Sequence, residues 1–335
     1  MSILKNVYNL SFNLRNLKPW TYLDESDVFG VQIPGSDKKY FVSIMGGGGE
    51  HYAIAAYEGP VALLDFWTLS DPDSWFRPAD LLTIPHLMVS FENMSEIEPR
   101  TRKAIKDFGF NIMGKKAWPD LKQCIPGFVP HFPEQEALAD LEVILEQVLH
   151  VVGRAKSSTY FIMPENMDND MYLMRVNTSP GSDKWEDTYW KLELPVTEFE
   201  MLFSDDDRKS LKGLMQTNKV LQADISITNK VVAPPGEKPY FSCIYILMDK
   251  TSHMALDFEL LPPHEGLDAV YARIPQLIIE SLLKLRWRPE VIEFRHPMLY
   301  EMTQKVLSAS KITSSLKNRL NAVDDFLENF TEASL

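Results

Sequence analysis

The C-terminal third of the chain has a succession of strand-like and helix-like segments that few folds share. Three strand-like runs come first, and a long amphipathic helix follows them. A strand, a second helix, a short last strand and a terminal helix complete the order. The segments are 221–227, 240–248, 253–261, 267–285, 291–294, 297–307, a short strand near Ile312, and 321–330.

This order of three strands, a crossover helix, a strand and another helix resembles that of ribonuclease H-like folds, and it predicts an α/β C-terminal domain of that type. Nucleases and integrases with this fold hold paired divalent metal ions between two or three carboxylates. The resemblance implies one carboxylate on the first strand, one at or just after the fourth strand, and one on a later helix. Asp224 lies in the first predicted strand.

The other two positions depart from that pattern. After the fourth predicted strand the chain reads Glu293-Phe294-Arg295-His296-Pro297, so His296 takes the place expected for the second carboxylate, with Arg295 beside it. Asp324 and Asp325 are the candidates for the helical carboxylate. One aspartate beside an arginine and a histidine makes a poor site for two metal ions, which indicates a degenerate, non-catalytic domain.

Two functional classes stay open. The favoured class is a binding or interaction module without a cofactor, in which Asp224 forms a hydrogen bond to a neighbouring loop. The alternative is a metal-dependent nuclease or phosphohydrolase, with Asp224, His296 and Asp325 as catalytic residues and a divalent metal ion as cofactor. The fold alone does not decide between them, because one fold can carry many functions.

Four consecutive glycines, Gly46–Gly49, separate two strand-like runs at 40–45 and 52–57. Glycine adopts positive φ without strain and leaves room for another group to approach the backbone. The run lacks the lysine and the serine or threonine of a phosphate-binding loop, and a strand follows it. We expect it to line a functional surface; a mobile hairpin tip is the alternative. The candidate binding residues are Gly47, Gly48, Glu50, His51 and Tyr52.

The remaining segments predict an α+β N-terminal domain built on an antiparallel meander. The expected helices are 3–17, 61–69, 95–107, 133–153 and a short one after Ser204; Ser95 and Glu98 would form a capping box. The expected strands are 28–33, 40–45, 52–57, 86–91 and a hairpin at 171–176 and 188–194, while 114–133 is expected to be an ordered loop. The expected domains are 1–155, a connecting hairpin and helix at 156–218, and 219–335.

Several short motifs occur in an order that resembles an uncharacterised bacterial family. They are Met45-Gly46, Gly49-Glu50-His51-Tyr52, Ala55, Tyr57-Glu58-Gly59, Gly114-Lys115-Lys116-Ala117-Trp118-Pro119, Pro126-Gly127-Phe128-Val129-Pro130, Lys238-Pro239-Tyr240, Met248-Asp249 and Arg288-Pro289-Glu290-Val291-Ile292. In that family one domain of unknown function follows another, and the motifs extend over most of this chain. The resemblance implies no activity, so it transfers no functional residue.

The charge of the chain constrains its partners. A net charge of −13 at pH 7 disfavours nucleic acid, because binding through phosphates needs a basic face. The basic cluster at 100–106 is typical of a solvated helix face, and the one at 284–288 suits a helix C-terminus. We therefore expect a protein or a small molecule as the partner; the oligomeric state stays open.

The sequence also favours the cytoplasm. The N-terminus does not resemble a signal peptide, and no window approaches the roughly 18 apolar residues of a membrane span. Cys124 and Cys243 are far apart and lack metal-binding spacing, which predicts two buried thiols in a reducing compartment. His253, Asp257 and His264 lie close in sequence, but ordinary surface roles are favoured for them and no metal site is predicted.

Overall fold

The computed structural model describes residues 2–71, 74, 78–165, 167–179, 184–193 and 205–332. The chain forms two compact units. The first consists of Met1–Trp67, Ile84–Cys124 and Pro130–Pro195, and the second of Thr68–Thr83, Ile125–Val129 and Val196–Leu335. The chain therefore passes between the units several times. The predicted cap Ser204 and most of the predicted turn at 179–183 lie outside the described residues.

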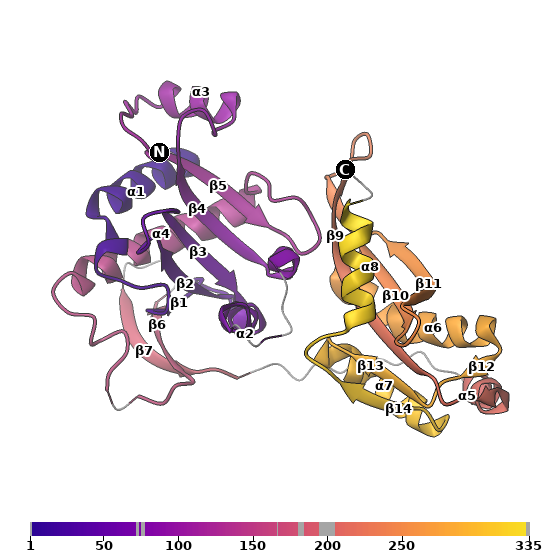
Figure 1. The fold of residues 1–335 in the computed structure, drawn as a ribbon. Coiled ribbons are helices and arrows are strands. Elements are labelled where there is room, and N and C mark those ends of the chain that lie inside the picture. The colour runs from indigo at the N-terminus through magenta and orange to yellow at the C-terminus, as the bar shows by residue number, and fades with distance from the viewer. Residues whose placement is uncertain are drawn as a thin grey trace. The chain divides into compact units, whose positions relative to one another are not determined.

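The first unit is built on a seven-stranded sheet in the order β5-β4-β3-β2-β1-β6-β7 (Figure 1). The strands are β1 Phe29–Gln32, β2 Lys39–Met45, β3 Ala53–Glu58, β4 His86–Glu92, β5 Trp118–Cys124, β6 Met171–Asn177 and β7 Trp185–Lys191. All neighbours are antiparallel except β1 and β6, which are parallel. The predicted three-stranded meander is confirmed as β1 to β3, and the strand predicted at 86–91 is β4, which pairs with β3. The hairpin expected to connect the domains extends this sheet instead, because β6 pairs with β1.

Helices cover both faces of this sheet. They are α1 Ile3–Leu17, α2 Gly59–Ser70, α3 Pro99–Asp107 and α4 Gln135–Ala155, with a 3-10 turn η1 at Pro19–Thr21. On one face, the apolar stripes of α1 and α4 share a core with Val42 and Ile44 of β2. On the other, Phe66 of α2 stacks on Tyr57 of β3 with ring centroids 4.7 Å apart. Successive side chains of a strand point to opposite sides, so β2 and β3, which have helices on both sides, are buried along nearly their whole length, whereas the outer strand β7 is mostly exposed.

Residues 114–133, predicted as a loop, contain the edge strand β5, which pairs with β4 through seven residues. The prolines and aromatics of this stretch led to the wrong interpretation. Pro119 fits here because an edge strand has one side without a ladder partner, so its missing N–H leaves no hydrogen bond unmade.

Two helix starts also differ from the prediction. The third helix begins at Pro99 rather than at Ser95, since proline presets φ for the first helical position. Glu96 instead closes a separate turn by accepting a hydrogen bond from the Asn93 amide at 2.8 Å. α4 begins at Gln135, shortly after the predicted start, and runs past the predicted stop at Gly153 to the buried Ala155.

The second unit contains a five-stranded sheet in the order β11-β10-β9-β13-β14. The strands are β9 Val220–Val232, β10 Tyr240–Asp249, β11 Met254–Leu261, β13 Val291–Phe294 and β14 Thr313–Leu316; β8 Met215–Gln216 pairs separately with β12 Trp287–Arg288. β9, β10 and β11 are antiparallel, whereas β13 and β14 run parallel to β9. This is the predicted ribonuclease H-like order, with the first strand central and the fourth beside it.

The helices of the second unit also divide between the two faces. They are α5 Asp205–Gly213, α6 Leu267–Leu285, α7 Pro297–Ala309 and α8 Asn321–Glu332, with a 3-10 turn η2 at Pro78–Thr83. α6 and α7 share a core with Ala223 and Ile225 of β9. α8 packs on the other face, against Ile246 of β10, which is the register partner of Asp224. Asp224 therefore points to the side of α8. None of the described helices combines the length and the apolar character needed to cross a membrane.

Candidate functional site

Arg295, directly after β13, lies where the ribonuclease H-like order leads us to look for metal ions. Its Nε and Nη2 donate hydrogen bonds to Oδ2 of Asp224 at 3.1 and 2.7 Å. Its Nη1 lies 2.7 Å from Oδ1 of Asp324 on α8. Arg295 is 4% exposed and Asp224 1%. One buried guanidinium thus joins the carboxylate of the first strand to that of the terminal helix.

These residues do not fit a pair of divalent metal ions. Such ions need carboxylate oxygens as ligands, and Arg295 already engages one oxygen of Asp224 and one of Asp324 while adding a positive charge to the same space. Among the described residues, no group of three or more His, Cys, Asp or Glu side chains is arranged to hold a metal ion. The cavity beside Asp224 measures about 20 Å³, room for about one water molecule.

The two other predicted catalytic candidates make different contacts. His296 precedes α7, and its Nδ1 accepts a hydrogen bond from the Met298 amide at 3.3 Å, which caps the helix. Asp325 pairs with His253 at 2.7 Å on the surface. The structure therefore joins Asp224 to Asp324 through Arg295. His296 borders the small cavity beside Asp224, whereas Asp325 lies apart from it.

A second polar network lies on the same face of the sheet. The Gln222 side chain donates to Glu293 at 2.9 Å and accepts from the Ala322 amide at the start of α8, also at 2.9 Å. Lys250 donates to the other oxygen of Glu293 at 2.7 Å. Charged and polar groups under α8 are thus satisfied by internal partners, and they tie the helix to β9 and β13.

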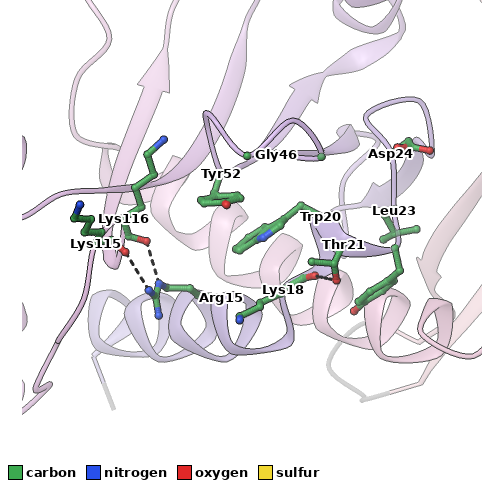
Figure 2. A pocket seen from close by; sticks show the side chains of 13 residues that line it. Arg15, Lys18, Trp20, Thr21, Leu23, Asp24, Gly46, Tyr52, Lys115 and Lys116 are labelled. Atoms are coloured by element: carbon green, nitrogen blue, oxygen red, sulfur yellow. Dashed lines mark hydrogen bonds between the residues drawn. The ribbon is translucent and has the colours of Figure 1, made fainter.

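The first unit has an open pocket of about 790 Å³ beside the glycine run (Figure 2). The end of α1, the turn η1, the loop after β2 and the segment before β5 form it. Its lining consists of Arg15, Lys18, Trp20, Thr21, Tyr22, Leu23, Asp24, Gly46, Gly47, Gly49, Tyr52, Lys115 and Lys116. Four cations and one carboxylate therefore face a single cavity in an otherwise acidic chain.

Aromatic packing explains why a glycine is needed at one end of the run. Tyr52 stacks on Trp20 with ring centroids 4.6 Å apart. Gly46 has φ +130°, and a Cβ there would lie 2.6 Å from Cδ1 of Tyr52. An L-residue would clash with the ring and strain the backbone. The glycine thus lets the loop close over an aromatic wall, as Figure 2 shows for Tyr52, Trp20 and Gly46.

α1 holds the basic side of the pocket in place. Arg15 Nε donates to the carbonyl oxygen of Lys116 at 3.1 Å, and Nη2 donates to that of Lys115 at 3.4 Å. The Lys116 ammonium lies 5.6 Å from the centroid of the Tyr52 ring. Lys18 ends α1 in the left-handed region with φ 50°. Within the described part of the chain, none of the four cations pairs with a carboxylate.

The pocket includes two of the five predicted binding residues. Gly47 and Tyr52 line it, whereas Gly48, Glu50 and His51 are exposed outside the lining. His51 Nδ1 lies 3.9 Å from a Glu92 carboxylate oxygen.

Sequence reasoning missed Arg15, Lys18 and Trp20 as site residues. The run Lys18-Pro19-Trp20 at the end of a predicted helix was the available signal. Lys115 and Lys116 stood in a quoted motif, but nothing in the sequence placed that motif beside the glycine run.

Comparisons with solved structures return remote similarities. The catalytic core domain of BIV integrase is 14% identical, with 35% of this chain and 68% of that chain covered and a TM-score of 0.24. A paired-end complex of Mos1 transposase with the left transposon end is 13% identical, with coverages of 70% and 71% and a TM-score of 0.24. Similarities of this size say nothing about the activity of this chain. No curated protein shows a significant sequence match.

Family models match both halves of the chain. Residues 207–331 match the Domain of unknown function (DUF6930) and include the five-stranded sheet. Residues 5–175 match the Domain of unknown function (DUF7309). The second match covers slightly more than half of the chain and contains every residue that lines the basic pocket. The chain therefore belongs to the family described as Domain of unknown function (DUF7309), followed by a second domain of unknown function.

Proposed function

We propose that this protein is a non-catalytic binding module of the cytoplasm, whose ribonuclease H-like unit is structural and whose N-terminal unit presents the ligand site. The observation that carries the proposal is the bridge of Asp224 and Asp324 by Arg295. Metal-dependent phosphoryl chemistry needs those oxygens for the ions that hold the attacking and leaving groups.

The energetics of the bridge favour a structural role. Breaking a buried ion pair by removing one partner costs about 3–5 kcal/mol, because the remaining charge stays buried without compensation. A metal ion that bound Oδ2 of Asp224 would have to displace Arg295, and the guanidinium would then need another partner. η2 lies against β9, and its residues Asp80 and Thr83 line the small cavity next to Asp224. A phosphodiester therefore has no room at this position.

The pocket of the first unit suits binding better than catalysis. General acid–base or nucleophilic chemistry uses a positioned base beside the reacting group, most often a histidine or a serine–histidine or cysteine–histidine pair. The lining of this pocket contains no histidine, cysteine or serine. Its one hydroxyl outside the tyrosines, Thr21 Oγ1, donates to the carbonyl oxygen of Lys18 at 2.8 Å. These groups can hold a ligand but offer no activated nucleophile.

The location in the cytoplasm is supported by the thiols. Cys124 and Cys243 are both buried and free. Burial raises the pKa of each thiol to about 12, so neither is a reactive thiolate at neutral pH. Unpaired, inert cysteines are typical of proteins in a reducing compartment.

The proposal is tested by incubating the purified full chain with single- and double-stranded DNA, RNA and a chromogenic phosphodiester in the presence of Mg²⁺ or Mn²⁺. We expect no cleavage above that of Asp224→Asn, and no Mn²⁺-dependent rise in the unfolding temperature. Cleavage that is lost in Asp224→Asn would overturn the proposal and support a metal-dependent hydrolase.

Two further variants keep this test decisive. Asp325→Asn is the matched control, because Asp325 is exposed and lies outside the Arg295 bridge. Asp324→Asn removes the more exposed partner of Arg295 and serves where Asp224→Asn fails to fold. Cleavage that falls in Asp324→Asn and persists in Asp325→Asn would also count against a structural role.

A further inference from the structure

We propose that the basic pocket beside the glycine run binds a phosphorylated small molecule of nucleotide size. This assignment rests on the proposed binding function and names the ligand class for it. The argument starts from charge: Arg15, Lys18, Lys115 and Lys116 face one cavity and outnumber its single carboxylate, Asp24. Like charges held together repel one another, and a bound polyanion relieves that repulsion.

The cations are free to act on a ligand. None of them forms an ion pair within the described residues, although the chain carries many more acidic than basic side chains. The Nε and Nη2 groups of Arg15 donate hydrogen bonds to the backbone carbonyl oxygens of Lys116 and Lys115. Arg15 therefore fixes the lysine segment and keeps its own positive charge. Ammonium and guanidinium groups form strong charge-assisted hydrogen bonds with phosphate oxygens.

The pocket has two chemically different ends. In Figure 2, Lys115, Lys116 and Arg15 lie on one side of the Trp20 ring, and Asp24 lies on the other. A carboxylate accepts hydrogen bonds from hydroxyl or amine groups. A ligand with phosphates at one end and a hydroxyl-bearing group at the other, such as a nucleoside phosphate, matches this polarity. An inorganic anion alone satisfies only the basic end.

The volume of the pocket and the backbone of the glycine run both suit a phosphorylated small molecule. A cavity of about 790 Å³ falls within the range of about 300–1,000 Å³ that is common for small-molecule sites. Gly47 lines the cavity, and its amide has no hydrogen-bond partner among the described residues. Without a Cβ at Gly47, a ligand can approach that amide directly. The open glycine run thus supplies a donor beside the aromatic wall.

The experiment titrates ADP, inorganic pyrophosphate and adenosine against the full chain, with tryptophan fluorescence and the unfolding temperature as readouts. We expect ADP and pyrophosphate to bind and stabilise the chain, ADP more strongly, and adenosine to have little effect. Lys18→Gln with Lys116→Gln should weaken ADP binding by about tenfold for each lysine removed, the typical effect of a lost charge-assisted hydrogen bond. Binding should also weaken as salt is added.

The matched control is Lys103→Gln with Lys106→Gln on α3, which removes the same charge from exposed positions outside the pocket. It should leave ADP binding unchanged. The inference is overturned if neither ADP nor pyrophosphate stabilises the chain at millimolar concentration, or if the control weakens binding as much as the pocket variant. Binding of a single-stranded oligonucleotide without binding of ADP would also overturn it. None of these outcomes involves cleavage, so they are distinct from a failure of the proposed non-catalytic role.

Discussion

The buried bridge of the second unit and the open pocket of the first unit both gather charged side chains, but they balance charge differently. Arg295 meets two carboxylates and is almost wholly buried. The four cations of the pocket meet one carboxylate in the lining and stay in contact with solvent. The first arrangement is complete without a ligand, whereas the second leaves positive charge unneutralised.

This difference indicates where to look for function. A buried charge without a partner is costly, so the groups at Asp224 are held by the fold itself. Exposed cations tolerate the absence of a partner because water solvates them, and they remain available to an anion. The ribonuclease H-like order therefore draws attention to Asp224, whose charge is already neutralised. The unneutralised positive charge instead makes the pocket of the first unit the better candidate for a ligand site.

The largest expected effect comes from Arg295→Leu. The substitution leaves Asp224 buried without its cation, so we expect the free energy of unfolding to fall by about 3–5 kcal/mol. Urea unfolding measures it. Arg273→Leu is the matched control in the same unit, because Arg273 pairs with Glu259 at 3.1 Å on the surface. An exposed pair contributes about 1 kcal/mol or less. If Arg295→Leu and Arg273→Leu lowered the free energy of unfolding equally, the buried bridge would be no more important for stability than an exposed ion pair.

Next in size is Gly46→Ala in the wall of the pocket. The new methyl group would meet the Tyr52 ring at 2.6 Å and the backbone would be held at φ +130°. We expect a loss of about 1–3 kcal/mol in the free energy of unfolding and altered tryptophan fluorescence. Gly48→Ala, which meets nothing within 4 Å, should change stability by about 0.5 kcal/mol or less. A similar loss in both variants would show that packing on Tyr52 is not the reason for glycine.

A smaller effect should appear as pH dependence in the first unit. Burial lowers the pKa of His86 below the ordinary 6.5 despite its contact with the Ile84 carbonyl. The unfolded chain then binds the proton more readily, so stability falls as the pH drops through 6.5, by at most about 1.4 kcal/mol per pH unit from this group. His86→Gln should flatten this slope in pH-dependent urea unfolding. An unchanged slope would assign it to other groups.

Asp249 of the second unit should respond only at lower pH. Burial alone would raise its pKa, but hydrogen bonds from Lys219 and the Ser252 and Thr251 amides lower it overall. Its stabilisation is present above the ordinary pKa of 3.8 and is lost as the pH falls through the depressed value. Hydrogen exchange of β4 and β10 between pH 7 and 5 should therefore show loss of protection in the first unit before the second.

The smallest expected effect on stability is that of Lys115→Gln. This exposed lysine has no ion pair in the part of the chain that the structure describes, and it lies among like charges. We expect a change in unfolding free energy of about 0.5 kcal/mol or less, in the stabilising direction. The difference should fade as added salt screens the repulsion. A clear destabilisation would show that the lysine serves the fold rather than a ligand.

Most of the fold could be predicted from the sequence because apolar periodicity and turn residues agree along the chain. The segments 267–285 and 291–294 match α6 and β13 to the residue. The secondary-structure prediction failed at two prolines, because proline can end a regular element but can also stand in an edge strand or at the first position of a helix. Pro119 stands in an edge strand, and Pro99 starts a helix four residues after the predicted cap.

The candidate site was harder to predict because its parts are far apart in sequence. Arg15 and Lys116 meet only after α1 and the segment before β5 pack together. The sequence placed Arg295 beside Asp224 in the fold, yet the choice between Asp324 and Asp325 depended on which face of α8 turns to the sheet. The face of α8 that turns to the sheet is set by the packing of Ala322 and Val323 on β10. The local sequence pattern does not distinguish two adjacent aspartates in this respect.

The interleaved path of the chain limits how this protein can be divided or exchanged. A segment of residues 196–335 would lack Thr68–Thr83 and Ile125–Val129, which belong to the second unit. It would lose the hydrogen bonds from the Val129 amide to Pro239 and from the Phe241 amide to Gly127. Recombination of genes at a single junction therefore cannot transfer the second unit intact. A graft of the C-terminal half alone would therefore carry an incomplete sheet border, and the small cavity beside Asp224 would lack the two wall residues, Asp80 and Thr83, that η2 supplies.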